Sequence, residues 1–242
     1  MLWRRLVASQ ARSITAAAFV VAAASLVSRI LGVLRDRVLA SEFGAGVELD
    51  IYYAAFRIPD MIYNLIVIGA LSAGFIPVLA KFKDNKEQAW ALVSASIYWL
   101  SIIITGLAVI CGLSMPWLVA ILTPGFDSAT QSVVVWMSLV MLLSPLLLGI
   151  SGVLGSVLQT YQQFFLYSLG PILYNIGIIF GALFLVPYLG LYGLAVGVVL
   201  GALLHLLINV PGMYLLGYRF TWRAKNHPAL RQVVSLTVPR LG

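Results

Sequence analysis

The sequence has 242 residues, of which 62% are hydrophobic and 10% are charged, and its mean hydropathy is +1.01. A soluble domain is about 45–50% apolar and about 25% charged, so this composition excludes a soluble fold, a disordered chain and a collagen-like chain. It also argues against an outer-membrane barrel, whose strands alternate polar and apolar residues. What remains is an all-α polytopic membrane protein, and the length allows roughly six or seven spans.

Apolar segments follow one another along the chain, separated by charges, glycines or prolines. We expect six of them to cross the membrane as helices, at about 13–40, 49–79, 89–121, 128–158, 165–186 and 191–216. A last stretch, 230–242, has the pattern of the first turns of a seventh helix. The chain therefore divides into a transmembrane lobe of six helices, 1–218, and a loop with the start of the seventh helix, 219–242.

Basic residues gather in predicted loops that alternation places on one side of the membrane. These are Arg4, Arg5, Arg12, Lys81, Lys83, Lys86, Arg219, Arg223, Lys225 and Arg231. The loops on the other side carry Glu42, Glu48 and Asp127 and no Lys or Arg. Cytoplasmic loops are enriched in Lys and Arg, so we expect a cytoplasmic N-terminus. The Ala-rich start also has the outline of a cleaved signal peptide, but the apolar segment continues to Leu34, so we expect it to be retained.

Charged residues lie inside the first two segments, where each costs about 2.5–3.5 kcal/mol on insertion scales. They are Arg29, Arg35, Asp36, Arg37, Asp50, Arg57 and Asp60. Helical spacing places Ser28 with Arg35, and Arg29 with Asp36, on one polar stripe. Asp50, Arg57 and Asn64 recur in the same way on the second segment. Two such stripes on neighbouring helices are expected to face each other or a watered cavity.

Two interpretations of these charges are open. They neutralise one another as structural pairs, Arg29 with Asp36 and Arg57 with Asp50 or Asp60, or they bind a ligand. Arginine presents a planar fork that suits phosphate, and the charges have a slight cationic excess. A cavity of this kind suits an anionic, phosphate-bearing amphiphile.

The other polar signals are weaker. Glycines recur at three- and four-residue spacing, at Gly149, Gly152 and Gly155 and at Gly193, Gly197 and Gly201, which predicts close helix packing. We expect Asn175, and the pair His205 and Asn209, to make hydrogen bonds between helices rather than a proton site. With one cysteine, Cys111, and two histidines, we expect no disulfide, metal site, cofactor or catalytic residue, and hence no enzyme.

Motifs along the whole chain resemble one transporter family. The segment from Ser28 to Asp36, SRILGVLRD, is similar to the first-helix signature of the MurJ (MviN) lipid II flippases. FGAG at 43–46 followed by Asp50, AFRIPD at 55–60, and FIPVL at 75–79 resemble their first outer loop and second helix. TPGF at 123–126 and VPRLG at 238–242 resemble the loop between the third and fourth helices and the start of the seventh helix.

This resemblance implies the multidrug/oligosaccharidyl-lipid/polysaccharide (MOP) exporter fold, with two helical lobes around a central cavity, of which this chain matches the N-terminal lobe. It also implies a bacterial inner-membrane protein that moves lipid II, a polyprenyl-pyrophosphate glycolipid, to the outer leaflet by alternating access. The implied partners are lipid II, membrane lipids and the missing C-terminal lobe, and nucleic acid is not among them.

The resemblance also suggests roles for individual residues. Arg29 and Arg35, with Ser28 and Arg57, are expected to bind the substrate, Asp36 to orient an arginine, and Asp50 to lie at an outer gate. Tyr63 and Asn64 stand where relatives often have a basic pair, and Ile68 stands where many have a gate glutamate.

Alternative functions are a related exporter of another polyprenyl-linked glycan or of drugs, and a membrane scaffold without transport. Further helices in the gene would favour a transporter, and a stop codon after Gly242 would favour a scaffold or a split subunit.

Overall fold

The computed structural model describes residues 14–44, 46–68, 74–222 and 226–237, and they fold into a bundle of helices. The first half contains α2 (Ile14–Phe43), α3 (Val47–Ile62), the π-helix η1 (Tyr63–Ile68), α4 (Ile76–Ala80), α5 (Lys86–Leu113), α6 (Met115–Leu122) and α7 (Ser128–Met141). The second half contains α8 (Leu143–Thr160), α9 (Phe164–Phe180), the π-helix η3 (Gly181–Leu185), α10 (Val186–Leu189), α11 (Tyr192–Leu207), α12 (Val210–Leu216) and α13 (Leu230–Thr237).

Within the described residues, five helical segments are long and apolar enough to cross a membrane. They are Ala18–Phe43, Lys86–Leu113, Ser128–Thr160, Phe164–Leu189 and Tyr192–Leu216, and each matches one of the expected spans. The remaining expected span, 49–79, is helical in α3, η1 and α4, but residues 69–73 lie outside the described part of the chain. The all-helical membrane fold is confirmed.

Prolines mark the places where the long helices divide. Pro116 follows the break between α5 and α6, Pro145 that between α7 and α8, and Pro211 that between α11 and α12. Proline has no N–H to donate to the carbonyl one turn earlier, so the backbone ladder is interrupted there. The expected spans 89–121, 128–158 and 191–216 are therefore each divided into two helices.

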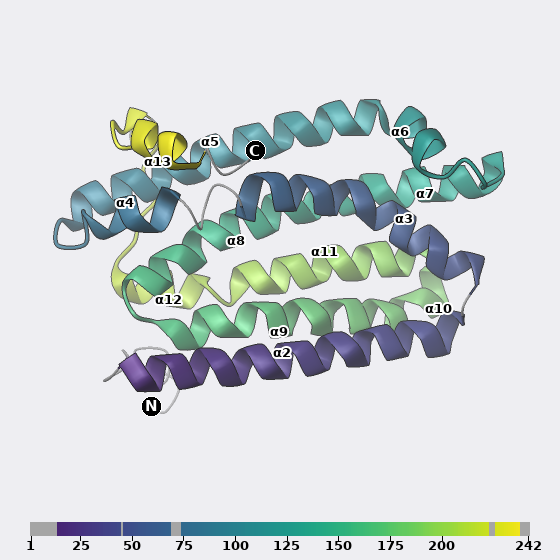
Figure 1. Cartoon of the computed structure of the whole chain (residues 1–242), viewed down its shortest axis with the longest axis horizontal. Helices are drawn as coiled ribbons and strands as arrows, with labels where there is room; N and C mark the ends of the chain where they lie inside the picture. The colour runs from purple at the N-terminus through teal and green to yellow at the C-terminus, as the bar shows by residue number, and fades with distance from the viewer. Residues whose placement is uncertain (1–13, 45, 69–73, 223–225, 238–242) are drawn as a thin grey trace.

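The connections between helices alternate between the two ends of the bundle (Figure 1). The start of α2, the connection from α4 to α5, and α13 lie at one end. The turn from α2 to α3, the connection from α6 to α7, and α10 lie at the other end. At this second end Asp127 caps α7, its carboxylate accepting a hydrogen bond from the Thr130 N–H. Hydrogen bonding with the Thr130 side chain, and then with its backbone N–H, lowers the pKa of Asp127. The expected alternation of loops is thus present in the fold.

Glycines bring α11 against α9 and η3 at backbone distance. Gly177 meets Gly201, and a Cβ added to Gly197 would lie 2.7 Å from the Cα of Gly181. Only small residues allow helices to approach so closely. In lipid the hydrophobic effect does not drive helices together, so this close van der Waals packing stabilises the contact instead. The packing predicted for Gly193, Gly197 and Gly201 is confirmed. In α8, Gly155 instead faces the side chain of Tyr167.

Candidate functional site

A cavity of about 320 Å³ lies among five membrane helices and the π-helix η1. Its lining comes from α2, α3, η1, α8, α9 and α11, and comprises Arg35, Phe56, Pro59, Asp60, Tyr63, Ser144, Leu148, Pro171, Tyr174 and His205. Arg35 is the single Lys or Arg among these lining residues. Of the charged residues that the sequence places inside the first two segments, only Arg35 and Asp60 are among the residues that line this cavity.

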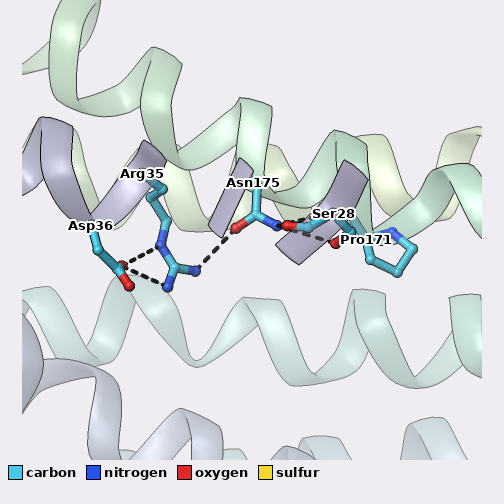
Figure 2. A network of polar contacts seen from close by, with 5 residues as sticks. All are labelled: Ser28, Arg35, Asp36, Pro171 and Asn175. Carbon is cyan, nitrogen blue, oxygen red and sulfur yellow. Dashed lines mark hydrogen bonds and ion pairs between the residues drawn. The ribbon is translucent and has the colours of Figure 1, made fainter. Parts of the chain in front are cut away.

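Arg35 is held in place from both sides of its guanidinium (Figure 2). Its Nε and Nη2 donate to Asp36 Oδ1 at 3.0 and 2.8 Å, and its Nη1 donates to Asn175 Oδ1 at 3.1 Å. These bonds engage one N–H on each guanidinium nitrogen. Each terminal nitrogen carries a second N–H, so, among the described residues, two donors of a planar fork are left for an acceptor such as phosphate. The side chain is 28% exposed, which leaves it reachable.

Asn175 connects α9 to α2 at this point. Its Nδ2 donates to the carbonyl of Pro171 at 3.0 Å and, over 3.4–3.5 Å, to the carbonyl and Oγ of Ser28. The side chain is buried, and a buried amide is costly unless it is hydrogen-bonded. The hydrogen bonds between helices predicted for Asn175 are confirmed. Because Asn175 also binds Arg35, it shares in the orientation of the guanidinium.

The prediction of an ion pair between Arg29 and Asp36 is wrong. Asp36 binds Arg35, and Arg29 is exposed, with no hydrogen bond or ion pair in the described part of the chain. Two residues seven apart share a helix face but lie about 10 Å apart along the axis, too far for a direct ion pair. The neighbouring position brings Arg35 within reach instead.

The charges of α3 lie mostly elsewhere. Asp50 and Arg57 line a second cavity of about 490 Å³, which α3 forms with the connection from α6 to α7, Thr123 to Phe126. Both residues are exposed, and no ion pair joins Arg57 to Asp50 or Asp60 among the described residues. Asp60 lines the first cavity and accepts a hydrogen bond from Asn64 at 2.9 Å. Of the predicted site residues, Arg35 lines the first cavity and Asp50 and Arg57 line the second, whereas Ser28, Arg29 and Asp36 are not among the lining residues of either.

Several polar lining residues were not among the predicted site residues. Tyr63 and Tyr174 come from η1 and α9, and His205 comes from α11. His205 and Asn209 meet Ser151 of α8, so their predicted role in contacts between helices is confirmed. The side chain of Ile68, at the expected gate, lies outside the described residues.

Metal ligands do not gather anywhere in the described part of the chain: no group of three or more His, Cys, Asp or Glu residues could hold an ion there. Cys111 is a half-buried free thiol. The chemistry of the first cavity is instead that of a fixed guanidinium, two phenols, a carboxylate and an imidazole, which can bind an anion that carries hydroxyl or amide groups.

Comparison with known proteins identifies the family. A family model described as "Lipid II flippase MurJ" matches residues 39–242. The lipid II flippase MurJ of Burkholderia cenocepacia is 32% identical over 227 residues, which cover 89% of this chain and 44% of that protein. A probable lipid II flippase MurJ of Haemophilus influenzae is 32% identical over 234 residues, covering 87% and 44%.

Solved structures share the fold. A lipid II flippase MurJ in an inward closed conformation superposes with a TM-score of 0.74 at 23% identity, over 92% of this chain and 47% of that one. A MOP superfamily transporter from Pyrococcus furiosus gives a TM-score of 0.65 at 14% identity, over 98% and 53%. The chain spans about half the length of these proteins, which corresponds to one lobe. The family consists of transporters rather than enzymes, and this chain belongs to the MurJ lipid II flippase family.

Proposed function

We propose that this chain forms the N-terminal lobe of a transporter that moves lipid II from the inner to the outer leaflet by alternating access. The observation that carries the proposal is Arg35, fixed at the cavity by Asp36 and Asn175, with two N–H donors that no described residue engages. A doubly held guanidinium in a membrane cavity suits the pyrophosphate of a polyprenyl-linked glycolipid. Relatives named as lipid II flippases supply the identity of that glycolipid.

The other site residues take supporting roles in this proposal. Asp36 and Ser28 belong to the network that orients Arg35. Arg29 is exposed on the same helix, more than one turn before Arg35, and attracts the anion toward the cavity. Asp50 and Arg57 act at the second cavity, where Asp50 contributes to the outer gate. The partners are lipid II, membrane lipids and the C-terminal lobe.

We further propose that the protein lies in the bacterial inner membrane with its N-terminus in the cytoplasm. In this proposal residues 1–218 form the transmembrane lobe, and residues 219–242 form a loop and the start of the seventh helix. Support comes from Lys81, Lys83 and Lys86, whose loop lies at the same end of the bundle as the start of α2 and α13. In a Cys111→Ser background, Gly46→Cys and Ser128→Cys should react with an impermeant thiol reagent from outside intact cells, and Asn85→Cys should not. The reverse pattern would invert the proposed orientation.

The function is tested in cells depleted of their own flippase and supplied with the complete two-lobed transporter that contains this chain. Arg35→Ala should be inserted normally and fail to support growth, whereas Arg35→Lys, which keeps the charge and loses the planar fork, should support it in part.

A purely structural role for Arg35 has a different signature, because its loss would strand the carboxylate of Asp36. Arg35→Ala would then express poorly, and the double variant with Asp36→Asn would restore both expression and growth. Restored growth would refute the substrate-binding role.

The alternative functions are tested with the unaltered protein. If it supports growth only in cells that lack the export of another polyprenyl-linked glycan, the substrate is that glycan. Failure in both strains would favour a scaffold.

A further inference from the structure

A cluster of three polar side chains ties the break between α11 and α12 to α8. Ser151 Oγ lies 2.8 Å from the carbonyl oxygen of His205 and 2.7 Å from the Nδ1 of the same residue. Asn209 Nδ2 lies 2.9 Å from Ser151 Oγ and 3.1 Å from the His205 carbonyl. The backbone N–H of Asn209 bonds to the Leu206 carbonyl at this break, so the His205 carbonyl takes its donors from side chains.

The proton positions in this cluster follow from counting donors. A carbonyl oxygen only accepts, so the single hydroxyl proton of Ser151 is donated to the His205 carbonyl. If that proton went to the imidazole instead, two oxygen lone pairs would face each other at 2.8 Å. Asn209 donates to Ser151 Oγ, and the remaining lone pair of this oxygen faces His205 Nδ1. Nδ1 must therefore carry the ring proton, and Nε2 is left as an acceptor.

His205 lines the first cavity, and its Nε2 makes no hydrogen bond within the described part of the chain, where the ring bonds through Nδ1. The ring packs on Gly170 of α9, where a Cβ would lie 2.7 Å from Nε2, and the next residue, Pro171, lines the cavity together with His205. The titratable and charged groups that line the same cavity are Arg35 from α2, Asp60 from α3, Tyr63 from η1 and Tyr174 from α9, while α8 contributes Ser144 and Leu148. The cavity thus has a cationic donor on α2 and a neutral acceptor on α11.

We propose that His205 is a specificity-determining residue of this cavity, whose Nε2 accepts a hydrogen bond from a hydroxyl or amide N–H of the headgroup attached to the pyrophosphate. This inference rests on the proposed function, since it assumes that Arg35 holds the anionic part of the same ligand. A bare pyrophosphate has oxygens to accept from Arg35 but no hydroxyl or amide to donate to His205. His205 therefore distinguishes glycosylated from unglycosylated lipid pyrophosphates.

The binding test uses the purified two-lobed transporter with two probes, undecaprenyl pyrophosphate and lipid II. His205→Leu should weaken lipid II binding about tenfold, the loss of one hydrogen bond to a buried acceptor, and leave undecaprenyl pyrophosphate binding unchanged. His205→Gln, which retains an acceptor oxygen, should keep most of the affinity for lipid II. The matched control is His227→Leu, which alters the other histidine, on the loop before α13, and should affect neither probe.

The outcomes separate the two proposals. If the unaltered transporter binds neither probe, the proposed function itself fails, and the role of His205 fails with it. If it binds both probes and His205→Leu weakens both equally or neither, the proposed function stands and the specificity role of His205 is refuted.

The proton assignment has a separate test in the nitrogen NMR spectrum of histidine-labelled protein. His227 is an internal reference, because its Nε2 faces Gln88 Oε1 at 3.0 Å and its Nδ1 accepts from the Ala229 N–H at 3.2 Å, which requires the Nε2–H form. The two histidines should therefore show opposite tautomers, assigned with His227→Leu. An Nε2–H form for His205 would remove the acceptor and overturn the inference.

Discussion

Helices α2 and α11 both pack against α9, and they do so by different chemistry. α11 meets α9 and η3 through glycines at backbone distance. In contrast, α2 is joined to α9 by the hydrogen bond that Arg35 donates to Asn175 and by the one that Asn175 donates to Ser28. The most apolar stretch of α2 has no buried residue, whereas 44% of the corresponding stretch in Tyr192–Leu216 is buried. The same helix thus has a closely packed neighbour on one side and a polar, largely exposed neighbour on the other.

The difference indicates separate tasks for the two contacts. A glycine contact gains its energy from close packing, which is lost when the helices separate, so it favours one fixed arrangement. A polar contact at the edge of a cavity can exchange its partners for a ligand's groups. We therefore expect substitutions of the contact glycines in α11 to affect folding and substitutions around Arg35 to affect transport.

The largest effect on stability is expected at Gly201. A Cβ there would lie 2.5 Å from the carbonyl oxygen of Tyr174, so Gly201→Ala should force α9 and α11 apart and destabilise the fold by about 2–3 kcal/mol. In α2, Gly32 has no atom within 4 Å of an added Cβ. Gly32→Ala should therefore be neutral or gain up to about 1 kcal/mol from helix propensity. Thermal unfolding in detergent measures both, and equal losses would refute the distinction between the two helices.

An intermediate effect, on transport rather than stability, is expected at Asn175. Asn175→Leu removes the acceptor that holds Arg35 Nη1 and should lower transport about tenfold while the protein remains inserted. Ser28→Ala should have a smaller effect, because its bonds to Asn175 are 3.4–3.5 Å long and one of them uses the Ser28 backbone. A growth assay at reduced expression ranks the two variants. Asn175→Leu protein that transports normally would show that Arg35 needs no second anchor.

The smallest effect is expected at His227, which lies outside both helices and supplies a baseline. Burial lowers the pKa of His227 from its ordinary value of about 6.5. Because the folded pKa is depressed, the neutral ring contributes stability that is present above pH of about 6.5 and lost as the pH falls through the folded pKa. The Tm should therefore fall slightly between pH 7 and pH 5, and His227→Gln should reduce that fall. An unchanged fall in the variant would assign it to other groups.

How far the sequence predicts this molecule depends on the type of residue. The spacing of Gly193, Gly197 and Gly201 predicts the contact with α9, because small residues at helical spacing have one common use in membranes. Spacing also places Arg35 on a polar stripe, and the cost of a buried charge predicts a cavity beside it. In both cases local chemistry is sufficient.

Spacing along one helix cannot show which other helix lies against its polar stripe, so the ion-pair partners predicted for these charges are partly wrong. Asp50 and Arg57 share α3 with Asp60 but line the second cavity rather than the first, because α3 runs from one cavity to the other. Asp36 pairs with its neighbour Arg35 rather than with Arg29. His205 lines the cavity because α11 packs beside α8 and α9, which depends on the whole fold.

The most direct test of the account measures undecaprenyl pyrophosphate binding to the purified two-lobed transporter, with Arg35→Ala compared with Arg37→Ala. Both variants remove one arginine from α2, but Arg37 is exposed and does not line either cavity described here. Loss of charge-assisted hydrogen bonds should weaken binding about 30-fold in Arg35→Ala and leave it unchanged in Arg37→Ala. Folded Arg35→Ala protein that binds as well as the unaltered transporter, or an equal loss in both variants, would contradict the assignment of Arg35 to the pyrophosphate.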